Sequence, residues 1–230
     1  MKEIKTILCM GLIVITLASC GNSGKPANAG EGFKQEAVSQ EPTKTYREIA
    51  VEFVSEAIAL KQISLYIFLD YGVNWELMEQ GEKVYDEKNE LTRFHIEDMV
   101  LDQRQKFYES NNTFQTISKM LGDMGEKAKS LQGLKNDTQI SQADLELIGT
   151  KSMLFIDYVY KQAQRPTLKR SDFLVKGMEM YKEIEAAINQ TGEIAQEAAP
   201  KYKSIYNESL TSSVKQYWST FLIPYLNQEQ

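Results

Sequence analysis

Few residues of this 230-residue chain could carry chemistry, because it has two cysteines and one histidine. The histidine, His95, is followed by Asp98 and Asp102, which could share a helical face with it. There is no second histidine and no Glu-x-x-His pair, the pattern that carboxylate-bridged metals require. We therefore predict no metal and no cofactor, and interpret these side chains as a polar helix face.

Catalysis by a nucleophile has equally little support. The chain contains no Gly-x-Ser-x-Gly elbow, no phosphate-binding Gly-x-x-x-x-Gly-Lys-Ser/Thr loop and no dinucleotide fingerprint. Its net charge is −6, with 26 basic and 32 acidic residues, whereas a nucleic-acid binder normally presents a basic surface. We expect a protein that is not an enzyme and does not bind nucleic acid.

The strongest chemical signal lies at the end of the first apolar segment. Lys2 and Lys5 precede an apolar run over residues 6–16, which is too short to cross a bilayer comfortably, and small residues follow it. The segment Leu17-Ala18-Ser19-Cys20 resembles a bacterial lipobox. The resemblance implies a signal peptide over residues 1–19, cleavage before Cys20, thioether lipidation of Cys20, and acylation of the new amino terminus with a fatty acid such as palmitate.

Lipidation of Cys20 would leave the mature chain without a free thiol, since Cys9 lies in the part that is removed. The expected location is the bacterial cell envelope, with the lipid as the membrane anchor. Gly21 is not the aspartate of an inner-membrane retention signal. The resemblance therefore implies the outer membrane if the host has one, and otherwise the outer face of the plasma membrane.

Residues 20–44 are rich in glycine, asparagine, serine and alanine, with proline at both ends of the stretch. Such a composition is typical of a flexible linker, and roughly two dozen residues reach about 25–30 Å. We predict that this stretch is a tether between the lipid and a folded domain over residues 45–230.

The domain shows apolar residues at helical spacing and no convincing alternating strand. Gly81 and the charged stretch after it predict the end of the first helix, Asn89 predicts an N-cap for the second, and Ser141 with Asp144 resembles a capping box. The pattern predicts an all-α, up-and-down bundle of four to five amphipathic helices, with four if the segments around Pro200 form one kinked rod. The expected helical segments are 45–78, 90–131, 141–164, 171–195 and 202–225.

Aromatic residues are the richest signal in the domain. The run from Ile63 to Leu69 is apolar nearly all round, so it is either enclosed by helices or presented to another molecule. The candidate binding residues are Tyr66, Tyr71 and Trp75 of the first helix with Tyr217 and Trp218 of the last segment. They are either bundle core with hydroxyls at the rim or the border of a groove.

These features predict a lipid-anchored envelope protein that acts by binding another envelope protein. The alternative is a carrier of a small ligand or lipid. An exposed strip from Ile63 to Trp75 would favour a protein partner, and a lined cavity around it would favour a ligand.

Overall fold

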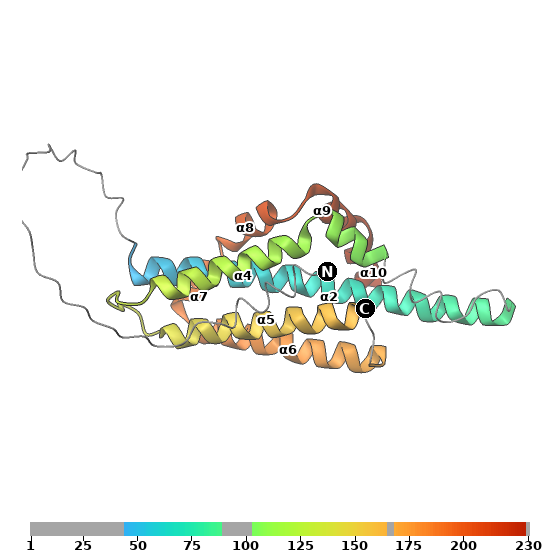
Figure 1. Cartoon of the computed structure of the whole chain (residues 1–230), viewed down its shortest axis with the longest axis horizontal. Coiled ribbons are helices and arrows are strands. Elements are labelled where there is room, and N and C mark those ends of the chain that lie inside the picture. The colour runs from blue at the N-terminus through green and yellow to red at the C-terminus, as the bar shows by residue number, and fades with distance from the viewer. Residues whose placement is uncertain (1–43, 89–102, 165–167, 229–230) are drawn as a thin grey trace, which may run out of the picture. The chain divides into compact units, whose positions relative to one another are not determined.

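A computed structural model describes residues 44–88, 103–164 and 168–228. Residues Thr45–Gln230 form a compact unit of their own. Every regular element in the described ranges is helical, which confirms the all-α helical bundle (Figure 1). The elements are α2 (Tyr46–Lys88), a helical stretch over residues 103–110, α4 (Thr113–Ser130), α5 (Gln142–Gln164), α6 (Arg170–Gln190), α7 (Glu193–Ala198), α8 (Tyr202–Ser209), α9 (Ser212–Tyr217), the π-helical turn η1 (Trp218–Leu222) and α10 (Ile223–Gln228).

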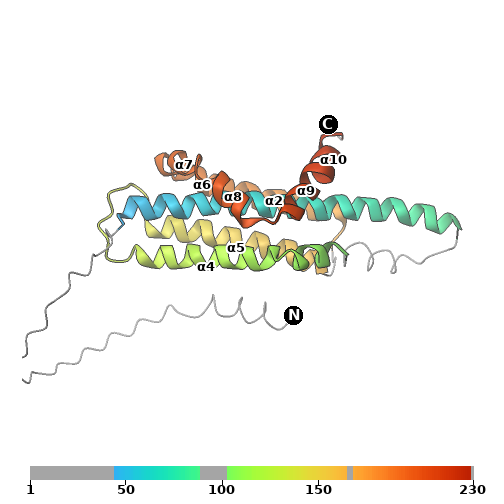
Figure 2. The same cartoon turned by 90° about the horizontal axis from the view of Figure 1, so that it is seen from above.

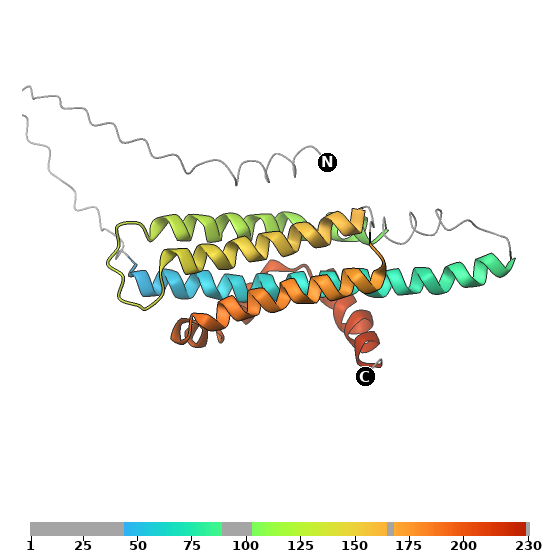
Figure 3. The same cartoon turned by 90° about the horizontal axis from the view of Figure 1, so that it is seen from below.

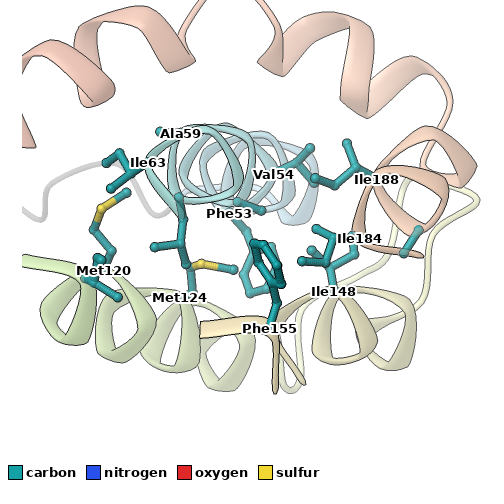
Figure 4. Close-up of a cluster of buried hydrophobic side chains, with 14 of the residues drawn as sticks. Phe53, Val54, Ala59, Ile63, Met120, Met124, Ile148, Phe155, Ile184 and Ile188 are labelled. Atoms are coloured by element: carbon teal, nitrogen blue, oxygen red, sulfur yellow. The ribbon is translucent and has the colours of Figure 1, made fainter. Parts of the chain in front are cut away.

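The central element is α2, which contacts α4, α5, α6, α7 and α8. Between Ile49 and Trp75 every residue of α2 is buried or half-buried, and buried side chains such as Phe53, Val54 and Ile63 point in different directions from its axis (Figure 4). A helix that is apolar all round is stable in water only when other elements enclose it. The run from Ile63 to Leu69 is therefore enclosed, which settles one of the two alternatives that its sequence left open.

The other helices divide into two groups around α2. The long helices α4, α5 and α6 run along α2 and form an arc on one side of it (Figure 3). The short helices α7 and α8 and the turn η1 contact α2 on its remaining side, and α10 projects away from it (Figure 2). The main aromatic core lies between α2, α5 and α6, where the ring of Phe68 is 5.7 Å from that of Phe155 and 4.9 Å from that of Phe173.

Glycine allows α2 and α6 to approach closely. A methyl group at Gly177 of α6 would overlap the ring of Phe68, and one at Gly72 of α2 would lie 2.8 Å from a methyl carbon of Leu174. A larger residue at either position would clash, so both glycines are needed for the close approach of the two helices. The contact fixes the separation of the two helices that enclose Phe68.

The predicted first and second helices need correction at their boundaries. Helix α2 does not end at Gly81 but continues to Lys88, because a single glycine costs only about 1 kcal/mol among residues that favour helix. The predicted cap at Asn89 lies outside the described residues. Helix α4 begins after Asn112, which adopts a left-handed φ of 56° and separates α4 from the helical stretch over residues 103–110.

The capping box at the start of α5 is confirmed. The backbone N–H of Ser141 donates to Asp144 Oδ2 at 2.8 Å, and the backbone N–H of Asp144 donates to Ser141 Oγ at 3.2 Å. The two residues thus satisfy backbone donors that the first turn of a helix leaves unpaired.

The prediction of one helix over residues 202–225 was wrong. The chain is extended at Leu210 and Thr211, and the Thr211 hydroxyl then caps α9 by accepting a hydrogen bond from the Val214 N–H at 3.3 Å. The fourth helix also ends early, at Gln190, because Gly192 turns the chain with a φ of 53°. In the described part of the chain, no helix combines the length and apolarity that a membrane span needs.

The glycine contact between α2 and α6 gives a test of this packing. Replacing Gly177 with Ala should destabilise the domain by about 1–3 kcal/mol, because the added methyl group forces the buried Phe68 ring to move. Urea denaturation of the purified protein measures the change. The matched control is Gly125→Ala in α4, where nothing lies within 4 Å and a gain of about 0.5–1 kcal/mol is expected. Equal effects at the two sites would contradict the packing described for Phe68.

Candidate functional site

The most unusual site in the described domain is a carboxylate in its interior. Asp70 of α2 is fully buried, with 0% of its surface exposed. Its Oδ2 accepts a hydrogen bond from the Tyr108 hydroxyl at 2.7 Å, and its Oδ1 accepts one from the Tyr217 hydroxyl at 2.6 Å. Asn74, one turn further along α2, donates to Oδ1 at 2.9 Å and to the Asp70 carbonyl at 2.7 Å. Both carboxylate oxygens are therefore satisfied within the protein.

A second set of contacts surrounds these hydrogen bonds. The indole N–H of Trp218 donates to the Tyr108 hydroxyl at 3.0 Å, and its ring lies 5.0 Å from that of Tyr66. The Arg104 guanidinium lies over the Tyr217 ring, 4.6 Å from its centroid. We call Asp70, Asn74, Arg104, Tyr108, Tyr217 and Trp218 the Asp70 cluster.

Three segments that are far apart in the sequence bring this cluster together. Helix α2 supplies Asp70 and Asn74, residues 103–110 supply Arg104 and Tyr108, and the junction of α9 and η1 supplies Tyr217 and Trp218. The helix changes from α to π hydrogen bonding at Trp218, directly where the segment meets α2. Such π turns often occur at functional positions.

Burial dominates the electrostatics of the Asp70 cluster. Desolvation raises the pKa of Asp70 above its ordinary value, and the hydrogen bonds from Tyr217 and Tyr108, the charge of Arg104 and the Asn74 amide oppose that rise. Desolvation also raises the pKa values of Tyr108 and Tyr217, with the nearby Asp70 charge as the second cause. Both hydroxyls therefore remain protonated at neutral pH and act as donors to the carboxylate.

This arrangement serves to fasten segments together. The hydroxyl, amide and indole donors are directed at acceptors within the cluster, while Arg104 Nη1 is buried without a hydrogen-bond partner. The hydrogen bonds to Asp70 join residues that are 38 and 147 positions apart in the chain. An acid or base that acts on a substrate must reach the proton that it moves, whereas the Asp70 carboxylate is enclosed by the protein.

A small pocket lies elsewhere, between α2, α4 and the start of α8. Its volume is about 210 Å³. Glu56 accepts an ion-pair hydrogen bond from Lys127 at 2.7 Å through one oxygen, while its other oxygen, Oε2, is buried without a partner. Desolvation raises the pKa of Glu56, and the ion pair with Lys127 opposes that rise. The pocket is lined by Glu52, Ser55, Glu56, Lys127, Lys201 and Ile205.

The candidate binding residues do not form one exposed surface. Tyr71 and Trp75 are core residues with 1% and 6% of their surface exposed, and the Trp75 ring packs 5.6 Å from that of Phe173 in α6. Trp218 is also buried, while Tyr66 and Tyr217 are half-buried. Of the two interpretations, bundle core describes these residues better than an exposed strip, but the hydroxyls of Tyr71 and Tyr217 do not reach the rim. The Tyr71 hydroxyl is buried without a partner, and the Tyr217 hydroxyl donates to the buried Asp70.

The sequence analysis missed Asp70, Asn74 and Tyr108. A signal for the first two exists, since Asp70 is the one charged residue between Ile63 and Trp75, and Asn74 follows it by one helical turn. A charge inside such an apolar run calls for a buried partner. Nothing local marks Tyr108 as that partner.

The polar face that contains His95, Asp98 and Asp102 lies outside the described residues. Within the described ranges, His, Cys, Asp and Glu side chains form no group of three or more that could hold a metal ion. No protein-family model, curated protein or solved structure matches this chain.

The buried carboxylate predicts a pH-dependent difference between the protein and its Asp70→Asn variant. Because folding raises the pKa of Asp70, its neutral form favours the folded state below the unfolded pKa, about 3.9. That contribution is lost as the pH rises through the folded pKa, whereas the asparagine variant carries no such dependence. Urea denaturation of both proteins between about pH 3 and 8 measures this. As the pH rises, the free energy of unfolding of the Asp70→Asn variant should increase relative to that of the unmodified protein. If the unmodified protein instead became more stable relative to the variant as the pH rises, folding would not raise the pKa of Asp70.

Proposed function

We propose that this chain is a bacterial envelope lipoprotein, held to a membrane by lipid on Cys20, that acts without catalysis by binding another envelope protein. The observation that carries the proposal is the segment Leu17-Ala18-Ser19-Cys20 at the end of a charged and then apolar start. Lipid attachment is the role that this segment supports. The helical domain then begins at Tyr46, separated from Cys20 by the linker-like stretch over residues 20–44.

A binding role agrees with how the domain uses its polar groups. The Asp70 cluster directs its donors and acceptors inward, so it supports packing rather than turnover of a substrate. The side chains from Ile63 to Trp75 pack against neighbouring helices, and the pocket near Glu56 lies away from them. This segment is neither an exposed strip nor the lining of that pocket, so it favours neither the protein partner nor the ligand carrier.

A partner must contact the outside of the domain, since Tyr71 and Trp75 are buried. Among the residues whose side chains the structure describes, the large apolar ones that are exposed are Leu147 and Leu154 on α5, Val175 on α6 and Phe221 on η1. Leu147 and Leu154 are seven positions apart and lie on the same side of α5. These four positions are therefore the first to test for an interface. Exposure alone does not identify a binding surface, because single exposed apolar side chains are common in folded proteins.

The anchor is tested by removing the lipidated thiol. Cys20→Ser should move the protein from the membrane fraction to the soluble fraction, because the lipid is the attachment that the lipobox implies. Fractionation followed by a salt wash and immunoblotting measures this. Cys9→Ser is the matched control and should leave the protein in membranes, since Cys9 precedes the cleavage site. Salt-resistant membrane binding of the Cys20→Ser protein would refute the lipoprotein assignment.

The binding role is tested by photo-crosslinking in the native host. A photoreactive amino acid placed at Leu147, Leu154, Val175 or Phe221 should give a defined adduct with one envelope protein from at least one position. Exposed polar positions on other helices, Lys119 and Gln196, serve as controls.

The adduct should disappear when Cys20→Ser is added, because the domain then leaves the membrane that brings the partner near. Mass spectrometry identifies the captured protein. Indistinguishable adducts at all six positions, or none at any, would count against a specific partner.

A further inference from the structure

We propose that residues 202–228, from α8 to α10, form a strap that opens from α2 as a unit while α2, α4, α5 and α6 stay folded. The Asp70 cluster is the fastening that holds the strap closed. The proposal concerns the folded domain and does not rest on the lipid anchor.

The strap depends on the rest of the domain for its order. Helix α8 has only eight residues, whereas an isolated helix shorter than about 12–15 residues is marginal in water. The rest of the strap is one continuous helical segment from Ser212 to Gln228, interrupted by the π-helical turn η1 and containing Pro224, which removes a helical hydrogen bond. The strap buries Leu210, Val214, Trp218 and Leu222, whereas α8 has no fully buried residue and packs its Tyr202, Ile205 and Tyr206 only half-buried against the core. Helix α10 packs on η1 and projects away from α2 (Figure 2).

The surface beneath the strap is partly polar and incompletely filled. At one end, α8 covers the pocket of about 210 Å³, where Glu56 Oε2 is buried without a partner. At the other end, Tyr217 and Trp218 rest on Asp70 and Tyr108 through hydrogen bonds. Water can replace these hydrogen bonds when the strap opens. Separating this polar contact therefore costs less free energy than exposing two apolar faces of the same area would.

The helices left behind keep a core of their own. Phe53, Phe68, Phe155 and Phe173 are fully or almost fully buried between α2, α5 and α6, and none of them belongs to the strap. Met120 and Met124 of α4 pack near Ile63 on the adjoining side of α2 (Figure 4). Local opening with a free energy below that of global unfolding is expected for a segment with few buried contacts.

Opening would uncover a defined face of α2. Tyr66 and Asp70 are the α2 residues that meet Trp218 and Tyr217 of the strap in the closed state. In the open state the Asp70 carboxylate is hydrated, which removes the desolvation that raises its pKa.

Hydrogen exchange of the full-length protein, read by mass spectrometry, tests the strap. Amides across residues 202–228 should exchange together and faster than those of α2, α5 and α6 under native conditions. Tyr217→Phe removes one donor to a buried carboxylate and should speed exchange throughout the strap by about tenfold or more, with α5 and α6 unchanged.

The matched control is Tyr206→Phe, which lies in the same strap and has no bond to Asp70. It should change exchange by less than about twofold, which is within the effect of an ordinary surface substitution. Equal protection of the strap and α2 in the unmodified protein would overturn the proposal. Faster exchange in α5 and α6 with Tyr217→Phe, or equal effects of the two substitutions, would also overturn it.

Discussion

The burial of α2 between Ile49 and Trp75 is the constraint on which the rest of the structure depends. A helix that is apolar in every direction cannot be covered by two or three neighbours, so the chain must supply helices all round it. The arc of α4, α5 and α6 covers one side with well-packed aromatic rings, and Gly177 lets α6 come close. Short pieces of the C-terminal segment complete the cover, and Asp70 is the position where they are secured.

The helices could be predicted, because apolar residues that recur every three or four positions indicate the period of an α-helix. Enclosure could not, since the run from Ile63 to Leu69 has the same pattern whether it faces other helices of its own chain or another protein. The break at Leu210 was also hidden, because the aromatic spacing of Tyr206 and Tyr217 continues across it. At the Asp70 cluster, only the pair Asp70 and Asn74 is local in sequence, while the tyrosine donors are brought there by tertiary structure.

The proposed function separates attachment from recognition. Attachment is assigned to Cys20 at one end of the chain, before the helical domain begins. Recognition is assigned to the outside of the bundle, because aromatic residues that resembled interface anchors, such as Trp75, are part of the core. Rings such as those of Phe68 and Trp75 thus lie in the core, whereas aliphatic side chains such as Leu154 are exposed.

The 147 positions between Asp70 and Tyr217 have a consequence for the order in which the chain folds. Synthesis proceeds from the N-terminus, so α2 is complete long before the segment that covers it exists. During that interval the carboxylate and Asn74 remain hydrated, and the charge opposes premature collapse of this part of α2 onto other apolar surfaces. The same group that is costly to bury in the finished domain therefore keeps this part of α2 polar for as long as the segment that covers it is absent.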